Sequence, residues 1–127
     1  MNEGIQRVVL VDQQLDPNEF IIGDEVDISS APTWSIQEMV KTFFPNRSPY
    51  WVRLQERQLG ITAPRSETST ARSFDLRYIE RFIHLLAEHG KLTLQDLIGA
   101  LVVLRQIAII TGVIKVPLSI TPLRSEP

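Results

Sequence analysis

Three stretches of this chain carry the same local signal for the start of an α-helix, and this signal limits the possible folds more than any other feature. Ser35 and Glu38 have the spacing of a capping box, in which each side chain accepts a hydrogen bond from the other residue's backbone N–H. Asp75 and Thr93 are N-cap residues too, and each has apolar neighbours spaced to pack together across the helix start. We therefore expect helices to begin at these three points.

A fourth helix start follows from Ser48 and Pro49, because proline at the first helical position loses no hydrogen bond. Gly90 and Gly112 stand where a left-handed residue typically ends a helix. The chain is therefore predicted to be mainly α-helical, with about four helices over residues 35–43, 48–59, 75–89 and 93–111. The tight break at residues 44–47 gives the first two helices the outline of a helix-turn-helix.

This pattern divides the chain into three regions. Residues 1–31 form an acidic N-terminal segment, with seven acidic residues against Arg7 alone. The composition of residues 8–11 and 20–22 fits a β-hairpin, which either packs on the helices or stays mobile. Residues 32–112 form the helical domain, in which residues 60–73 lack helical periodicity and fit a loop or a small β-wing. Residues 113–127 contain three prolines and are expected to be a flexible tail.

Composition argues against several classes of protein. The chain has no cysteine, which excludes disulfides and thiolate metal sites. It has no apolar run of the roughly 18–20 residues that span a membrane and no signal pattern, so we expect a cytoplasmic protein without a membrane partner. His84 and His89 are five apart and do not share a helix face, and Glu80 with His84 is expected to be a surface pair. We therefore expect neither an enzyme nor a cofactor or metal.

Basic residues are concentrated in the middle of this mildly acidic protein. From Lys41 to Arg72 there are six bases against Glu56 and Glu67. A local positive potential attracts the phosphates of nucleic acids even when the net charge is negative, here −2. The alternative is that these arginines are ordinary solvated surface residues. The candidate residues for binding double-stranded DNA are Arg47, Ser48, Tyr50, Arg53, Gln55, Arg57, Arg65 and Arg72.

Each candidate has an expected contact if the second helix enters the major groove. Arg53 and Arg57 lie four apart on one helix face and have the length to reach phosphates or guanine edges. Gln55 is the candidate reader of adenine. Glu56 is expected to orient one of the two arginines through an ion pair. The remaining candidates, with expected contacts to the backbone or an adjacent minor groove, are Arg47, Ser48, Tyr50, Arg65 and Arg72.

The stretch from residue 34 to about residue 110 resembles the DNA-binding domain of the MerR family of winged-helix regulators. The resemblance is carried, in order, by Trp34-Ser35-Ile36-Gln37-Glu38-Met39-Val40, Ser48-Pro49-x-x-Val52-Arg53-x-x-Glu56-Arg57, Arg72-Ser73-Phe74-Asp75-Leu76 and Leu85-Leu86-x-x-x-Gly90-x-Leu92-Thr93-Leu94-x-x-Leu97. It implies a winged helix-turn-helix that places its second helix in the major groove and its wing on the DNA backbone, and that regulates transcription. The words Trp-Ser-Ile, Ser-Pro-x-Trp and Gln-Glu-Arg are similar to those of small actinobacterial phage proteins of this kind, which would place the protein in the bacterial host's cytoplasm.

The chain also departs from the family pattern. Leu54 and Gln55 stand where the second helix of the family has two tyrosines, and Phe74 replaces the wing tyrosine. The residues after 111 predict neither a long coiled-coil helix nor an effector domain. No small-molecule effector is therefore expected.

The predicted helix over residues 93–111 is apolar almost all the way round and must be buried on several sides. One explanation is a homodimer, which would match the two half-sites of a palindromic operator. The other is that residues 8–11 and 20–22 cover this helix within one chain. Expected in the core of the domain are Trp34, Phe43, Phe44, Trp51 and Val52. The candidate dimerisation residues are Leu101, Leu104, Ile107, Ala108 and Ile110.

Two other functions fit the same fold. One is an architectural DNA-binding factor for recombination, excision or packaging. The other is a protein-interaction module that uses the wing and the apolar helix. The acidic N-terminal segment would then mimic DNA, or fold back over the basic helix as an inhibitor.

Overall fold

The computed structural model describes residues 15–64 and 73–115, and these form a small bundle of helices. The helices are α2 (Ile36–Phe43), α3 (Pro49–Leu59), α4 (Leu76–Glu88) and α5 (Leu94–Ile110). The predicted mainly α-helical fold is confirmed. The observed bounds differ from the predicted ones only at the terminal residues, where the cap residues themselves lie just outside each helix.

The predicted capping residues hold the first turn of each helix. In the capping box of α2, the Glu38 N–H donates to Ser35 Oγ (3.2 Å) and the Ser35 N–H donates to the Glu38 carboxylate (3.0 Å). The other three caps each accept one backbone N–H three residues later, at 2.7–3.2 Å, and are Ser48, Asp75 and Thr93. These bonds satisfy donors that a helix start otherwise leaves unpaired, which explains why four short helices begin at defined residues.

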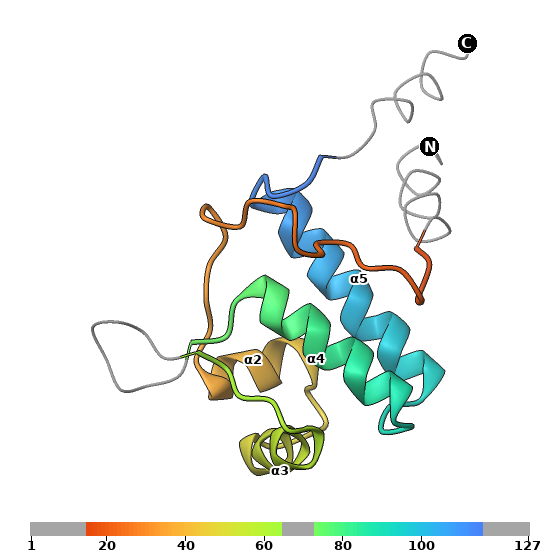
Figure 1. Cartoon of the computed structure of the whole chain (residues 1–127). Coiled ribbons are helices and arrows are strands. Elements are labelled where there is room, and N and C mark those ends of the chain that lie inside the picture. The colour runs from red at the N-terminus through yellow and green to blue at the C-terminus, as the bar shows by residue number, and fades with distance from the viewer. Residues whose placement is uncertain (1–14, 65–72, 116–127) are drawn as a thin grey trace.

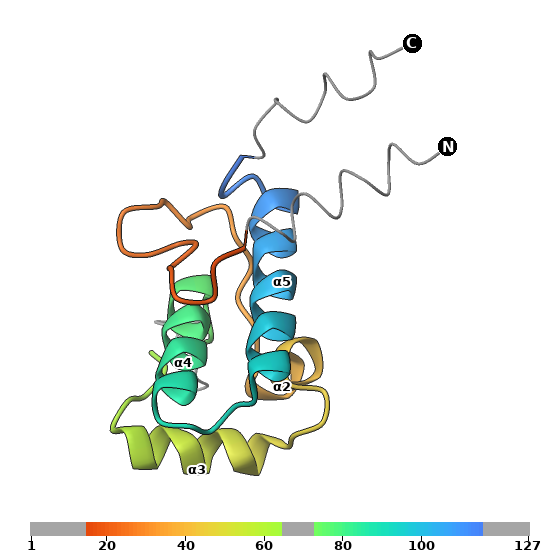
Figure 2. The ribbon, with the colours of Figure 1, turned by 90° about the vertical axis from the view of Figure 1, so that its right-hand side faces the viewer.

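The helices pack around one pair. α4 and α5 lie side by side and run in opposite directions, joined by a short turn (Figure 1). α2 packs against α5. α3 runs across the end of this pair (Figure 2). An antiparallel bridge between Trp34 and Phe74, with two backbone hydrogen bonds of 2.9 Å, ties the start of α2 to the start of α4. The result leaves one long side of α3 outside the bundle.

The core lies between all four helices. Phe44 contacts the rings of Trp51 and Phe82, with centroids 5.6 and 5.9 Å apart. Phe43, Phe44 and Val52 are buried as predicted, whereas Trp34 and Trp51 are half-buried at the edge. The largest fully buried apolar side chains are Phe74, Phe82, Met39, Leu76, Ile79, Ile83, Leu86, Leu101 and Leu104.

Residues 15–31 cover the top of the α4–α5 pair as an irregular chain of turns. The prediction of a strand at residues 20–22 is wrong. The backbone N–H groups of Ile21, Ile22 and Gly23 donate to the carboxylate of Glu80, which replaces the neighbouring strand that a hairpin would supply. The companion strand predicted at residues 8–11 lies outside the described residues.

We call the anchoring contacts of this segment the α4 clasp: Glu80 holds the three N–H groups, and Arg77 donates to the carbonyls of Gly23 (2.7 Å) and Val26. Glu80 is 1% exposed, so the prediction of a surface pair with His84 is wrong. The ring of His84 stacks on Phe20 instead, with centroids 4.2 Å apart. The side chain of Ile22, directly beside the clasp, is buried in the core. At least this part of the N-terminal region is therefore a structural cover.

The predicted dimerisation residues of α5 divide into two groups. Leu101, Leu104 and Ala108 are fully buried within the chain, because α4 packs over the side of α5 on which they lie. Their assignment to a dimer interface is wrong. Ile107 is half-buried and packs on the core, whereas Ile110 is 82% exposed.

The predicted wing falls mostly on residues 65–72, which lie outside the described residues. At its base, the Ser73 N–H donates to the carbonyl of Pro64 (2.8 Å), so the two chain ends that flank the segment are joined. In the described residues the Trp34–Phe74 bridge is the sole β-type pairing. None of the described helices is long and apolar enough to cross a membrane.

Candidate nucleic-acid interface

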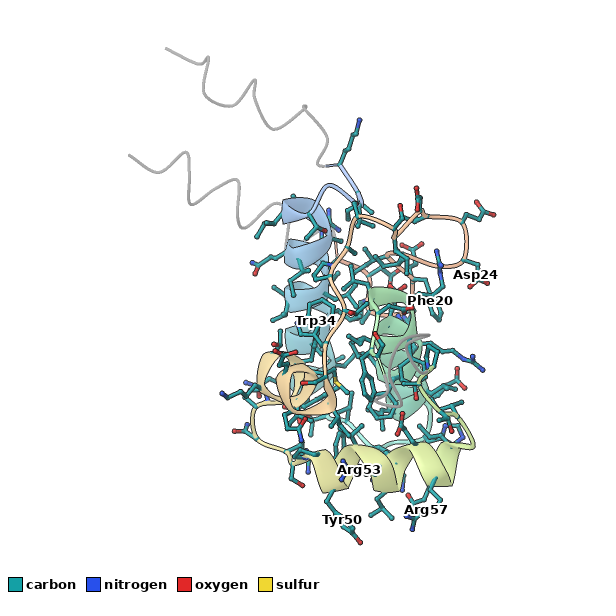
Figure 3. All side chains as sticks on the ribbon, turned by 90° about the vertical axis from the view of Figure 1, so that its left-hand side faces the viewer. Phe20, Asp24, Trp34, Tyr50, Arg53 and Arg57 are labelled. Carbon is teal, nitrogen blue, oxygen red and sulfur yellow. The ribbon has the colours of Figure 1, made fainter. Side chains whose placement is uncertain are left out.

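The outward side of α3 carries two arginines and a tyrosine. Val52, on the opposite side, is fully buried and fixes which face of the helix points inward. Residues three, four and seven apart share a helix face, so Tyr50, Arg53 and Arg57 lie along one stripe. All three are exposed, Tyr50 to 68%. Figure 3 shows the three side chains along the outer edge of α3, at one end of the molecule.

The exposed charges of α3 are all positive because its one acidic side chain points inward. Glu56 is 3% exposed and accepts hydrogen bonds from the Tyr78 hydroxyl (2.5 Å) and from the Ala63 N–H (3.4 Å). The prediction that Glu56 orients Arg53 or Arg57 by an ion pair is therefore wrong. Both guanidinium groups project from a face without a carboxylate on the same helix, which leaves them available to an anionic partner.

Gln55 cannot read a base in this orientation of the helix. It lies about 200° around the axis from Arg53 and Arg57 and is 5% exposed, so its assignment as an adenine reader is wrong. Its Oε1 atom is buried without a hydrogen-bond partner among the described residues. The physical reason is that Gln55 follows Val52 on the inner face, where it fills space between α3 and the core.

The start of α3 offers less to a phosphate than its sequence suggests. Pro49 has no N–H, and the Trp51 N–H is already bonded to the Ser48 hydroxyl (3.2 Å). In this first turn the Tyr50 N–H is the one that remains for an external acceptor. The guanidinium of Arg47 lies over the ring of Trp51, 4.8 Å from its centroid, and this cation–π contact holds an exposed positive charge beside the helix start.

The structure thus brings together five of the eight predicted DNA-binding residues, on α3 and the turn before it: Arg47, Ser48, Tyr50, Arg53 and Arg57. It removes Gln55 from the set. Arg65 and Arg72 lie outside the described residues, and the contacts predicted for them stay predictions.

Residues 15–31 lie at the end of the molecule opposite α3 (Figure 2). Asp24, in the N-terminal segment, lies toward the opposite end of the molecule from Arg53 and Arg57 (Figure 3). The backbone N–H and the side chain of Ser29 bond the nearby Asp27, and these bonds lower the pKa of its carboxyl. Residues 15–31 therefore do not fold over the basic helix as an inhibitor.

Within residues 15–64 and 73–115, no group of three or more histidine, aspartate or glutamate side chains is arranged to hold a metal ion. Comparisons with family models, with curated proteins and with solved structures give no match to this chain.

Proposed function

We propose that this chain binds double-stranded DNA in a sequence-specific manner and regulates transcription, with α3 in the major groove. The observation that carries the proposal is the outward face of α3, which presents Tyr50, Arg53 and Arg57 with no exposed acidic residue on the helix. α3 follows α2 across a tight turn and protrudes at one end of the bundle, as a recognition helix must if it is to reach base edges.

The spacing of the two arginines suits a groove. Arg53 and Arg57 are separated by about one helical turn, roughly 5–6 Å, which corresponds to one to two base-pair steps. Each guanidinium can form two parallel hydrogen bonds to O6 and N7 of a guanine. Tyr50 and Arg47, at the start of the helix, then face the sugar–phosphate backbone, where a hydroxyl and a cation fix the register of the protein.

The wing and the family belong to the same proposal. The resemblance to MerR-like proteins is carried by the sequence words between Trp34 and Leu97. In this proposal residues 65–72 form the wing, and Arg65 and Arg72 contact the backbone or an adjacent minor groove. The joined ends of the segment at Pro64 and Ser73 support it, because a hairpin-like excursion needs its two ends close together.

Salt dependence tests the proposal directly. Binding that uses about four phosphate contacts should weaken by about 10²-fold between 50 and 200 mM salt. Selection from a randomised duplex library, followed by anisotropy titration of the selected and a scrambled duplex, should show one preferred sequence. Affinity that ignores both salt and sequence would rule the proposed function out, whereas salt-dependent binding without sequence preference would favour an architectural role.

We further propose that the active form is a homodimer, with Ile110 rather than the buried residues of α5 in its interface. A side chain 82% exposed on an apolar helix end is available to a second copy. In analytical ultracentrifugation the wild-type protein should then sediment as a dimer and the Ile110→Asp variant as a monomer. The substitution should leave the thermal stability of the monomer unchanged. Gln106→Asp, an exposed change on the same helix, is the control for added charge. A wild-type protein that sediments as a monomer on operator DNA would contradict the dimer.

A further inference from the structure

Glu56 joins three parts of the fold at one point. Its carboxylate on α3 accepts the hydroxyl of Tyr78 from α4 (2.5 Å) and the N–H of Ala63 from the chain that leaves α3 (3.4 Å). Its backbone carbonyl accepts the N–H groups of Gly60 (2.8 Å) and Ile61 (3.1 Å) and so ends the helix. One residue therefore fixes α3 both to the core helix behind it and to the segment that follows.

The partner of Glu56 is itself held rigidly. The ring of Tyr78 is stacked on Phe82, with centroids 6.3 Å apart, and meets the edge of Phe74 at 5.6 Å. Both neighbours are fully buried. The hydroxyl of Tyr78 consequently has a fixed position, and a hydrogen bond to it constrains the rotation of α3 about its own axis.

The energetic balance indicates that this contact serves geometry. A buried carboxylate loses its hydration, and its hydrogen bonds roughly balance that cost, whereas an apolar side chain in the same place would stabilise the core at no such cost. Hydrogen bonds are directional and apolar packing is not, so the carboxylate defines an orientation that a leucine would leave loose. A recognition helix needs a defined orientation. The guanidinium of an arginine lies about 10 Å from the helix axis, so a rotation of the helix by about 10° displaces it by about 1–2 Å, which is more than a bidentate contact tolerates.

We infer that Glu56 and Tyr78 are positioning residues for sequence recognition: their hydrogen bond sets the rotation of α3, and with it the place at which Arg53 and Arg57 meet the base edges. The inference rests on the proposed function and names the contact that sets the orientation of α3 for it. Contacts to phosphates tolerate displacements of an ångström or two, but bidentate contacts to guanine do not. Loss of the hydrogen bond therefore lowers the affinity for the preferred sequence far more than the affinity for other DNA.

Tyr78→Phe tests this, because it removes the hydroxyl and keeps the packed ring. The full chain is titrated by anisotropy against its selected duplex and a scrambled duplex, at a temperature where circular dichroism shows both proteins folded. The variant should bind the selected duplex about 5- to 20-fold more weakly and the scrambled duplex within about twofold of wild type. Glu56→Gln keeps an acceptor for the Tyr78 hydroxyl and should retain most of the sequence preference.

A second buried carboxylate provides the control. Glu80→Gln disturbs a carboxylate on α4 that accepts hydrogen bonds from residues 21–23 of the N-terminal segment, so it should lower the thermal stability and leave the ratio of the two affinities unchanged. If Tyr78→Phe lowers both affinities by the same factor, or neither, the pair has only a structural role and the inference is overturned. A wild-type protein without a preferred duplex overturns the proposed function itself, and this inference with it.

Discussion

Replacing Glu80 with alanine should lower the free energy of unfolding by about 3–5 kcal/mol, a large share of the stability of a domain of this size. The variant removes the acceptor for three backbone N–H groups, those of Ile21, Ile22 and Gly23. The buried N–H of Ile22 and the half-buried N–H groups of Ile21 and Gly23 then lose their acceptor. The alternative for the chain is to release residues 20–23, which exposes Ile22 and opens the core beneath it.

Urea denaturation, monitored by circular dichroism, measures the loss of free energy of unfolding. In thermal unfolding of the same variant, the midpoint temperature should fall by about 10–20 °C. Glu80→Gln keeps one carbonyl acceptor, but its amide NH₂ group faces a backbone N–H, and both are donors. The free energy of unfolding should therefore fall for this variant too, but by less than for Glu80→Ala. Glu88→Ala is the matched control, because Glu88 is exposed on the same helix. A loss below 1 kcal/mol for Glu80→Ala would mean that the α4 clasp does not hold the N-terminal segment in solution.

The helices could be predicted because their signals are local. An N-cap serine and a glutamate three residues later contact each other whatever the rest of the chain does, and Ser35 with Glu38 forms the predicted bonds. The same holds for Asp75 and Thr93, whose partners lie three residues away. Fold class and helix bounds followed from such contacts alone.

The buried polar residues could not be predicted, because their partners are distant in sequence. Glu80 bonds residues 57–59 positions earlier, and Glu56 bonds Tyr78, 22 positions later. On a helical wheel Glu80 lies about 40° beyond Leu76, at the border between the apolar arc of α4 and the polar arc that contains His84. Periodicity at such a border fits a surface residue as well as a buried one, and the burial of Glu80 follows from residues 21–23 packing over it.

The candidate surface was predicted only in part, because local periodicity gives the stripe of side chains but not the face of the helix that is buried. The stripe of Arg53 and Arg57 follows from helical periodicity, but the face that points inward is decided by packing. α5 shows the same limit: its all-round apolar sequence indicates burial on several sides, yet it does not distinguish the arc that meets α4, with Leu101 and Leu104, from the arc that stays outside. Only the arrangement of the four helices separates them.

Replacing Arg53 and Arg57 together with alanine should weaken binding of the selected duplex by about 3–5 kcal/mol, or about 150- to 5,000-fold. Each bidentate contact contributes about 1–3 kcal/mol, and two neighbouring contacts are not strictly additive. Folding should be nearly unaffected, because both side chains are exposed and alanine favours a helix. Anisotropy titration at fixed salt measures the loss, and Arg81→Ala, an exposed arginine on α4, is the matched control for lost charge.

Lysine at the same two positions separates base reading from phosphate binding. A lysine keeps the charge but cannot form two parallel hydrogen bonds to one guanine, so Arg53→Lys and Arg57→Lys should each lose sequence preference while the salt dependence stays as in wild type. Arginines that only bind phosphates would tolerate lysine with little change for either duplex. A double alanine variant that binds the selected duplex within twofold of wild type would instead place the DNA on another surface, since α3 then contributes neither charge nor specificity.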